Sequence, residues 1–265
     1  MTDAWQRLAG ELARWAPGAA TFWWRDDDAV APSAALERLL GLGPQPLALA
    51  VIPAEMVPEL AGYLAGPYRA GRKVDVLQHG YAHRNYEPPE AKKAELGAAR
   101  ASAAVLEELG RGARLLAAAF GTQALPVLVP PWNRIAEPLI ELLPGEGYRG
   151  LSTQGPQQTR PPGMASRQRG LLQVNTHVDI VDWRGGWGFI GGEAAINLAV
   201  GHLAARRQGR AAAREPTGLL THHLVLPEAA FDFTAEFLAR TAEHPAVQWR
   251  AARDIFASGT GFASV

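Results

Sequence analysis

The chain contains no cysteine among its 265 residues. This absence excludes a disulfide framework, a thiolate nucleophile and a cysteine-ligated zinc site. The sequence also lacks an apolar run approaching ~18 residues, so no transmembrane helix is expected. Its first residues, Met1 to Leu8, are charged and helix-like, without the apolar core or the small-residue cleavage site of a signal peptide. We therefore expect a cytoplasmic protein that makes no membrane contact.

The chain has no excess of charge of either sign. It carries 26 basic and 26 acidic residues, which gives a formal net charge of zero. A basic surface is the usual electrostatic mark of a protein that binds nucleic acid or an anionic membrane, so neither partner is expected. The hydrophobic content of 48% is sufficient for a large core in a chain of this length. The expected partner is a small-molecule or oligosaccharide substrate, and the oligomeric state stays open.

Short β-prone runs alternate with longer helical stretches. This alternation predicts a parallel sheet, and seven or eight such units predict a closed barrel. We therefore expect an α/β fold, a distorted (β/α)7-8 TIM-like barrel that forms a single domain over residues 1–265. The expected strands are Ala20–Arg25, Leu47–Ile52, Val74–Gln78, Pro126–Val129, Tyr148–Ser152, Leu171–Asn175, Gly218–Thr221 and, more weakly, Val247–Arg250. The expected helices are Ser33–Leu40, Pro88–Leu109 with Gly110 and Gly112 as stop signals, Ile135–Leu142, Glu193–Gln208 and Thr234–Glu243.

Two stretches interrupt the alternation. The segment Thr153–Gly170 is poor in apolar residues and is expected to be a long loop, which in compact domains is usually functional or mobile. The segment Arg184–Gly192 joins glycines to aromatic residues. Its composition suits either a lid or a turn-rich connection.

Clusters of potential metal ligands follow three of the expected strands: Asp26–Asp28, the pair His79 and His83, and the pair His222 and His223. Adjacent carboxylates repel one another and lose solvation unless a cation lies among them. Each cluster alone has an ordinary explanation, such as a helix cap for Asp28 or a buried structural role for His223. The ends of parallel strands converge on one edge of a barrel, however, and there they could supply ligands to one ion. The clusters together indicate a metal-dependent hydrolase.

Five segments resemble, in order, the motif series of the polysaccharide deacetylase family, the NodB-homology proteins of carbohydrate esterase family 4. Trp24–Asp28 is similar to the family's T-F-D-D-G, and His79–His83 matches H-[ST]-x-x-H. Val129–Asn133 approximates R-x-P-[YW]-G, Asp179–Trp183 matches D-x-x-D-W, and Leu219–His222 is similar to L-x-L-x-H. The resemblance covers most of the chain and implies a distorted barrel of about seven βα units.

Three positions depart from the family pattern. Gly80 stands in place of a serine or threonine whose hydroxyl would brace the loop, and Asp28 stands in place of a glycine. Val129 stands in place of the arginine that orients the catalytic aspartate in the family. Three other arginines are candidates to replace it: Arg25, Arg134 and Arg184.

The resemblance implies a mononuclear metal site made by Asp27, His79 and His83. Two imidazoles, one carboxylate and an open position for water form the catalytic type of zinc site. Such a site lowers the pKa of a bound water to ~7 and polarises a substrate carbonyl. Zinc is the expected ion, with cobalt or nickel as alternatives. No organic cofactor is expected.

The resemblance also implies roles for three further residues. Asp26, next to the ligand Asp27, is expected to be the general base, and His222 the general acid that protonates the leaving amine. Asp182 is expected to orient a catalytic partner. An assignment shifted by one residue stays open, with Asp27 as the base and Asp28 as the ligand. His223 stays open as the acid.

The expected reaction removes an N-acyl group, such as acetyl, from a small or oligomeric amino sugar. The side chains expected to bind the substrate are Trp132, Asn133, Trp183 and Trp187. The three tryptophans offer apolar faces that could stack on a pyranose ring. One alternative keeps the metal site but hydrolyses another non-peptide C–N bond, as in allantoinase-like or acetyl-polyamine enzymes. A second alternative is a barrel that binds a sugar or a metal without turnover.

Overall fold

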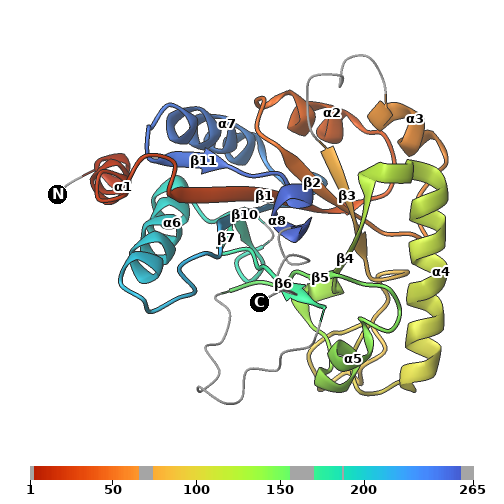
Figure 1. The fold of residues 1–265 in the computed structure, drawn as a ribbon. Coiled ribbons are helices and arrows are strands. Elements are labelled where there is room, and N and C mark those ends of the chain that lie inside the picture. The colour runs from red at the N-terminus through yellow and green to blue at the C-terminus, as the bar shows by residue number, and fades with distance from the viewer. Residues whose placement is uncertain (1–2, 66–73, 156–169, 187, 258–265) are drawn as a thin grey trace.

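The computed structural model describes residues 3–65, 74–155, 170–186 and 188–257 (Figure 1). A curved parallel sheet forms its centre, with strand order β6-β5-β4-β3-β2-β1-β10-β7, and β11 pairs in parallel with the start of β1. A separate antiparallel pair is formed by β8 and β9. The strands are β1 (Ala20–Ala29), β2 (Leu47–Val51), β3 (Val74–His79), β4 (Ala124–Val129), β5 (Gly150–Leu151), β6 (Leu172–Gln173), β7 (Val178–Asp179), β8 (Val181–Asp182), β9 (Gly188–Phe189), β10 (Thr217–Thr221) and β11 (Val247–Trp249).

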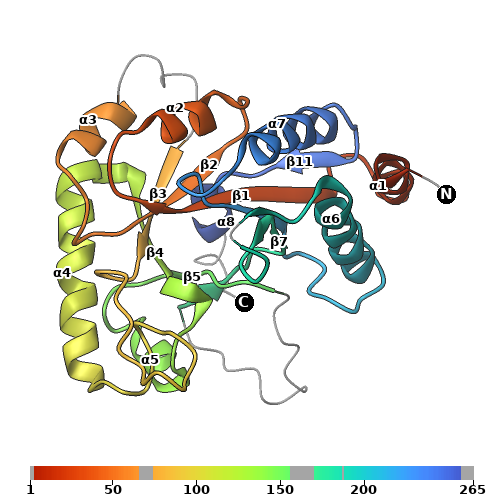
Figure 2. The same cartoon turned by 180° about the vertical axis from the view of Figure 1, so that it is seen from behind.

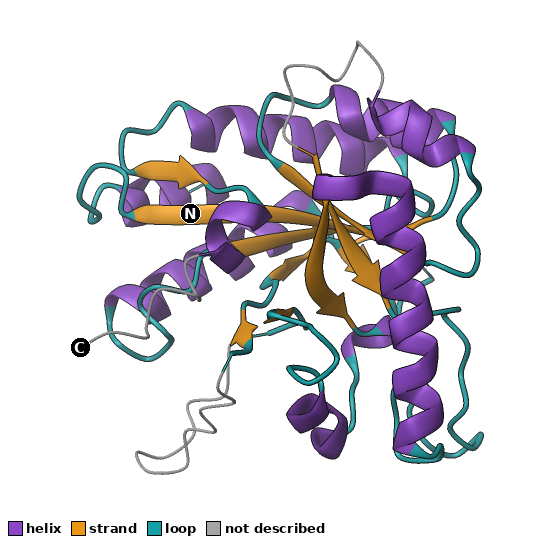
Figure 3. Ribbon diagram, turned by 45° about the vertical axis from the view of Figure 1, so that its right-hand side comes forward, coloured by secondary structure: helices purple, strands orange, loops and turns teal. Residues whose placement is uncertain are grey.

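Most helices lie around the outside of this sheet, whereas α8 packs on its concave side (Figures 2 and 3). Helix α1 lies beside α6. In the described part of the chain, none of them combines the length and the apolar content that crossing a membrane requires. The helices are α1 (Ala4–Leu12), α2 (Ala34–Gly41), α3 (Glu59–Ala65), α4 (Ser102–Phe120), α5 (Glu137–Leu142), α6 (Gly192–Arg207), α7 (Glu228–Ala242) and α8 (Ala252–Ala257). The expected distorted barrel of βα units is confirmed.

Strand β1 is buried on both faces, and its side chains alternate between them. Phe22 and Trp24 belong to the large core between the sheet and the outer helices. Trp23 belongs instead to a second core with residues of β2, β3, β4 and α8, on the concave side of the sheet. By the same period of two, Arg25 and Asp27 follow Trp23 onto the inner side.

The largest difference from the expected elements is the long helix. It was expected over Pro88–Leu109 but runs from Ser102 to Phe120, and residues 88–101 are irregular. The proposed stop signals Gly110 and Gly112 both lie inside the helix, and a Cβ at Gly112 would be 2.5 Å from Nε2 of Gln78. Close packing against β3 therefore explains Gly112. The helix ends at Phe120 and is followed by Gly121, whose φ is +54°.

Other boundaries differ at the ends of the elements. Strands β5 and β6 keep only the central residues of their expected runs, β1 continues through the three aspartates, and α7 begins at Glu228 rather than Thr234. The segment Arg184–Gly192 contributes β9 to the pair with β8, which favours a connection over a lid. Most of the loop expected at Thr153–Gly170 lies outside the described residues.

Candidate active site

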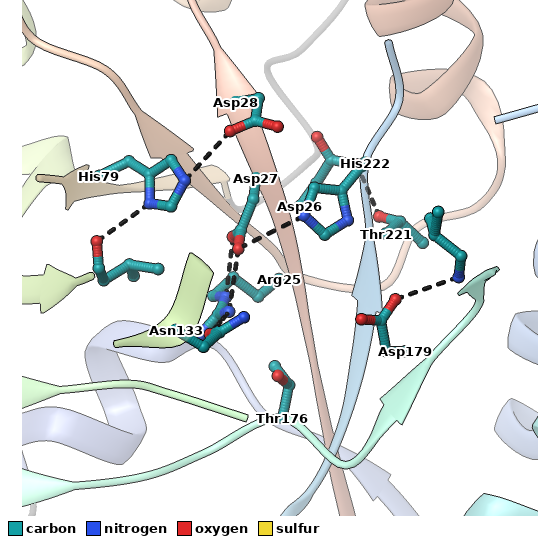
Figure 4. A network of polar contacts seen from close by, with 12 residues as sticks. Arg25, Asp26, Asp27, Asp28, His79, Asn133, Thr176, Asp179, Thr221 and His222 are labelled. Carbon is teal, nitrogen blue, oxygen red and sulfur yellow. Dashed lines mark hydrogen bonds and ion pairs between the residues drawn. The ribbon is translucent and has the colours of Figure 1, made fainter. Parts of the chain in front are cut away.

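Titratable side chains gather at the carboxyl ends of the central strands (Figure 4). Asp26, Asp27 and Asp28 come from the end of β1, and His79 ends β3. His222 directly follows β10. In parallel α/β barrels this edge of the sheet carries the active site, because the loops that follow different strands converge there.

Asp28, His79 and His83 form a compact group of potential metal ligands. Oδ1 of Asp28 lies 3.1 Å from Nε2 of His79 and 3.4 Å from Nε2 of His83. Ligand atoms bound at 2.0–2.1 Å around a tetrahedral zinc ion are about 3.3 Å apart, so these separations fit one ion. The sequence had favoured Asp27 as the carboxylate, but the structure brings Asp28 to the two histidines. This is the alternative assignment, shifted by one residue.

The tautomer of His79 suits metal binding. Its Nδ1 lies 3.0 Å from the carbonyl oxygen of Val129, which accepts a hydrogen bond from this nitrogen. With its hydrogen on Nδ1, the neutral ring directs the Nε2 lone pair towards Asp28. Two lone pairs facing each other at 3.1 Å repel unless a proton or a cation lies between them.

The charges in this group shift one another's pKa values. Burial alone would raise the pKa of Asp28. The hydrogen bond and charge of His79, together with the charges of His222 and His83, outweigh burial, so the pKa of Asp28 lies below its usual value. Burial alone would lower the pKa of His79, but Asp28 and Asp27 raise it. The group therefore favours a positive charge beside the Asp28 carboxylate, which a divalent cation would also provide.

Asp27 is held by Arg25 in a buried ion pair, with side-chain exposures of 1% and 0%. Nη2 of Arg25 donates to Oδ2 of Asp27 at 2.9 Å, and Nε lies 2.8 Å from Oδ1. The guanidinium also donates to Ser152 Oγ at 2.6 Å and to Asn133 Oδ1 at 2.7 Å. Of the arginines considered as replacements at the Val129 position, Arg25 is therefore the one in contact with a candidate catalytic carboxylate.

His222 also lies close to Asp27, with its Nε2 3.9 Å from Oδ2 of Asp27. Its ring meets the Trp183 ring edge-on, with the centroids 4.6 Å apart. Its neighbour His223 is buried against Asp26, where its Nδ1 lies 2.5 Å from Oδ1. The structure thus places His222, and not His223, beside the candidate catalytic groups.

The geometry does not support Asp26 as the general base. Asp26 lies on the opposite face of β1 from Asp27, since side chains alternate along a strand. Its carboxylate is fully buried and accepts hydrogen bonds from the Thr221 hydroxyl at 2.6 Å and the His223 amide at 3.0 Å. These contacts tie β1 to the end of β10, so Asp26 has a structural position.

Asp182 does not reach the catalytic groups either. Its Oδ1 accepts hydrogen bonds from the backbone amides of Arg184 and Gly185, which stabilise the turn before β9. Asp179, the other acid of the same motif, is the one near His222. Burial raises the pKa of Asp179, while the charge of His222 lowers it. Oδ2 of Asp179 accepts from Nε1 of Trp183 at 2.9 Å.

The aromatic residues expected to bind substrate lie at the two sides of the site. The Trp132 ring centroid is 4.4 Å from that of His83, and Trp183 packs on His222 and is 40% exposed. Asn133 is engaged by Arg25 through its side-chain oxygen. Trp187 lies outside the described residues.

Backbone strain is concentrated at the same place. The non-glycine residues with positive φ in the described ranges are Asp28 (72°), His83 (52°), Trp132 (54°) and Asn133 (56°). All belong to the candidate metal group or to the loop packed against it. Such conformations are costly for residues with a Cβ and persist mainly at functional sites.

His177, His202 and Glu215 form another buried group of potential ligands in the described part of the chain. The backbone amide of Gly218 donates to Nδ1 of His177 at 3.0 Å, so the neutral ring carries its hydrogen on Nε2 and has no lone pair there for a metal. The two imidazoles also stack with centroids 3.4 Å apart and planes at 15°, so their in-plane lone pairs do not converge. We therefore assign no metal to this group.

His202 should make the fold sensitive to acid. Burial, together with the charges of His177 and Arg206, lowers its pKa to about 2, whereas in an unfolded chain it is about 6.5. Below pH ~6.5 the unfolded state therefore binds a proton that the folded state does not. This lowers the free energy of unfolding by about 2 kcal/mol between pH 7 and pH 5. Urea unfolding at the two pH values should show a smaller loss for His202→Gln, and an equal loss would contradict the expectation.

No protein-family model matches this sequence, and no curated protein matches it significantly. Solved structures do match. A candidate polysaccharide deacetylase from Mycobacterium smegmatis is 18% identical with a TM-score of 0.63, over 93% of this chain and 92% of that one. An allantoinase is 16% identical with a TM-score of 0.61, over 94% and 93%. A family 4 acetyl xylan esterase from Clostridium thermocellum, solved with a cobalt ion, is 12% identical with a TM-score of 0.53, over 90% and 91%. The chain has the NodB-homology fold of polysaccharide deacetylases and family 4 carbohydrate esterases.

Proposed function

We propose that this protein is a metal-dependent hydrolase that cleaves a non-peptide C–N bond, with an N-acylated amino sugar as the first candidate substrate. The observation that carries the proposal is the convergence of Asp28, His79 and His83 at ligand–ligand distances suited to one ion, beside the ion-paired Asp27. The shared fold supports it, since neighbours with this fold include enzymes named as deacetylases and as an allantoinase.

Each side chain has a defined part in this reaction. A divalent cation bound by Asp28, His79 and His83 would supply Lewis-acid polarisation of the substrate carbonyl and acidify the attacking water. Asp27 would accept the proton of that water, while Arg25 fixes both carboxylate oxygens in position. His222, in its protonated form, would donate a proton to the nitrogen of the leaving amine. The C–N bond breaks as the new C–O bond is completed, and the products are a carboxylic acid and an amine.

Zinc is the first candidate for the ion, and cobalt or nickel are the alternatives; the Clostridium thermocellum esterase was solved with cobalt. Protein purified without an affinity tag should hold about one ion per chain, because three ligands form one such site. His79→Ala and Asp28→Asn should lose this ion, whereas Asp27→Asn should keep it. Elemental analysis of the three variants tests this. If Asp28→Asn keeps the ion and Asp27→Asn loses it, Asp27 is the metal ligand, as the sequence motif predicts.

The substrate is best tested with a panel. N-acetylglucosamine, its oligomers, allantoin and acetylated polyamines would be offered to the zinc- or cobalt-loaded protein. Trp132 and Trp183 flank the site with apolar rings, which favours a pyranose substrate. Acetate release from the amino sugars that a chelator abolishes and added metal restores is the expected result. Activity on allantoin or polyamines alone would keep the enzyme class and change the substrate, and binding without product by the metal-loaded protein would favour a non-catalytic barrel.

A further inference from the structure

A buried glutamate lies beneath the loop that joins the two metal-site histidines. Glu95 is fully buried, although it belongs to an irregular segment that follows the two histidines in the chain. Its Oε2 accepts a hydrogen bond from the backbone amide of Tyr81 at 3.1 Å, and its Oε1 accepts one from Ala82 at 2.7 Å. One carboxylate thus binds both backbone amides immediately before His83.

The segment that carries Glu95 is itself fixed on both sides. On one side, the Tyr86 amide donates to the carbonyl oxygen of Ala94 at 3.1 Å. On the other side, Leu96 forms a parallel bridge with Ile135, and the Leu96 carbonyl accepts from the Ala136 amide at 2.8 Å. The carboxylate is therefore presented from a supported position and not from a free loop.

Gly80 provides the space that Glu95 occupies. A Cβ at Gly80 would lie 1.9 Å from Oε2 of Glu95 and 2.6 Å from Cγ of Pro131. The φ of Gly80 is also +55°, which disfavours a side chain. Gly80 and Glu95 are therefore complementary, because the carboxylate can reach the Tyr81 amide only while position 80 has no side chain.

Fold stability alone does not favour a carboxylate at this position. The Glu95 side chain is fully buried, so its carboxylate gives up the hydration that a charged group has in water. An ionisable group that is costly to bury is best explained by the geometry that it imposes. That geometry concerns the loop that ends at His83, whose φ of 52° must be held against its natural preference.

We propose that Glu95 is a positioning residue for His83, and that with Gly80 it sets the place of the second imidazole of the metal site. The inference rests on the proposed metal site. The bidentate contact fixes the amides of Tyr81 and Ala82, and the chain leaves them in the direction that brings Nε2 of His83 to 3.4 Å from Asp28.

Glu95→Gln tests this assignment at constant size. The amide can accept only one of the two backbone hydrogens, and its NH₂ group faces the other. Zinc affinity, measured by competition with a chelating indicator, should fall by about 10- to 100-fold, as it does when groups that orient metal ligands are removed. Glu87→Gln is the matched control, because Glu87 lies in the same segment and binds the Ala99 amide instead. It should keep wild-type affinity.

A second measurement does not need the metal. Amide hydrogen exchange at Tyr81 and Ala82 in the metal-free protein should accelerate in Glu95→Gln and stay at the wild-type rate in Glu87→Gln. If Glu95→Gln does not fold, Glu95→Asp keeps the charge, withdraws it by one methylene, and should show intermediate affinity and exchange. Wild-type zinc affinity in the folded Glu95 variant would overturn the inference. A wild-type protein that binds no metal would instead overturn the proposed function, and the exchange rates would still test whether Glu95 braces the loop.

Discussion

Asp27→Asn is expected to reduce turnover by about 10²- to 10⁴-fold while the metal stays bound, the usual loss when a general base is removed. The asparagine amide is nearly isosteric with the carboxylate but cannot take the proton of the attacking water. Asp27 is also not the carboxylate in contact with His79 and His83, so the metal ligands stay intact. Measuring turnover and metal content on the same sample separates the loss of the general base from a loss of bound metal.

Asp26→Asn is the control for this prediction. Asp26 contacts His223 and Thr221 on the other face of β1. Its substitution should therefore lower the unfolding temperature, whereas the turnover of the folded fraction should change little. The expectation for Asp27 fails if Asp27→Asn retains wild-type turnover. A loss of turnover in folded, metal-loaded Asp26→Asn would return the role of base to Asp26.

The fold and the position of the site could be predicted because both depend on patterns local in sequence. The alternation of strands and helices predicts the barrel, and the polar residues after the strands place the site at their carboxyl ends. The residue register at Asp26–Asp28 could not be predicted. Successive strand residues point to opposite faces, so a shift of one residue exchanges the roles. The pairing of β1 with β2 is irregular between Asp26 and Ala29, and Asp28 has a positive φ.

Contacts between separate segments could not be predicted either. The sequence pattern predicts a helix at Glu95, and nothing near this residue in sequence indicates that it contacts the amides of Tyr81 and Ala82. Asp179 and Asp182 are equivalent in the motif, and only the fold places Asp179 near His222. A signal for Arg25 was present, however. Arg25 is two residues from Trp23 and two from Asp27, so all three share the inner face of a buried strand, and a buried arginine requires an anionic partner.

Arg25→Met is expected to destabilise the protein by about 3–5 kcal/mol, because it leaves the Asp27 carboxylate buried without its cation. Ser152 Oγ and Asn133 Oδ1 lose their donors as well. Turnover should fall in the same variant, since the carboxylate is no longer fixed at both oxygens. Urea denaturation and turnover of the folded fraction measure the two losses. Arg25→Lys keeps the charge but not the planar two-point contact, so we expect an intermediate result.

The combined variant Arg25→Met/Asp27→Leu distinguishes the ion pair from simple packing. Replacing both members of a buried pair by apolar residues is often neutral for stability, so this variant should regain much of the stability that Arg25→Met loses. Its turnover should stay as low as that of Asp27→Asn, because the base is absent. If the double variant is as unstable as Arg25→Met, the loss comes from the contacts of Arg25 with Ser152 and Asn133. Arg25 would then support the loops that follow β4 and β5, and holding Asp27 would not be its main role.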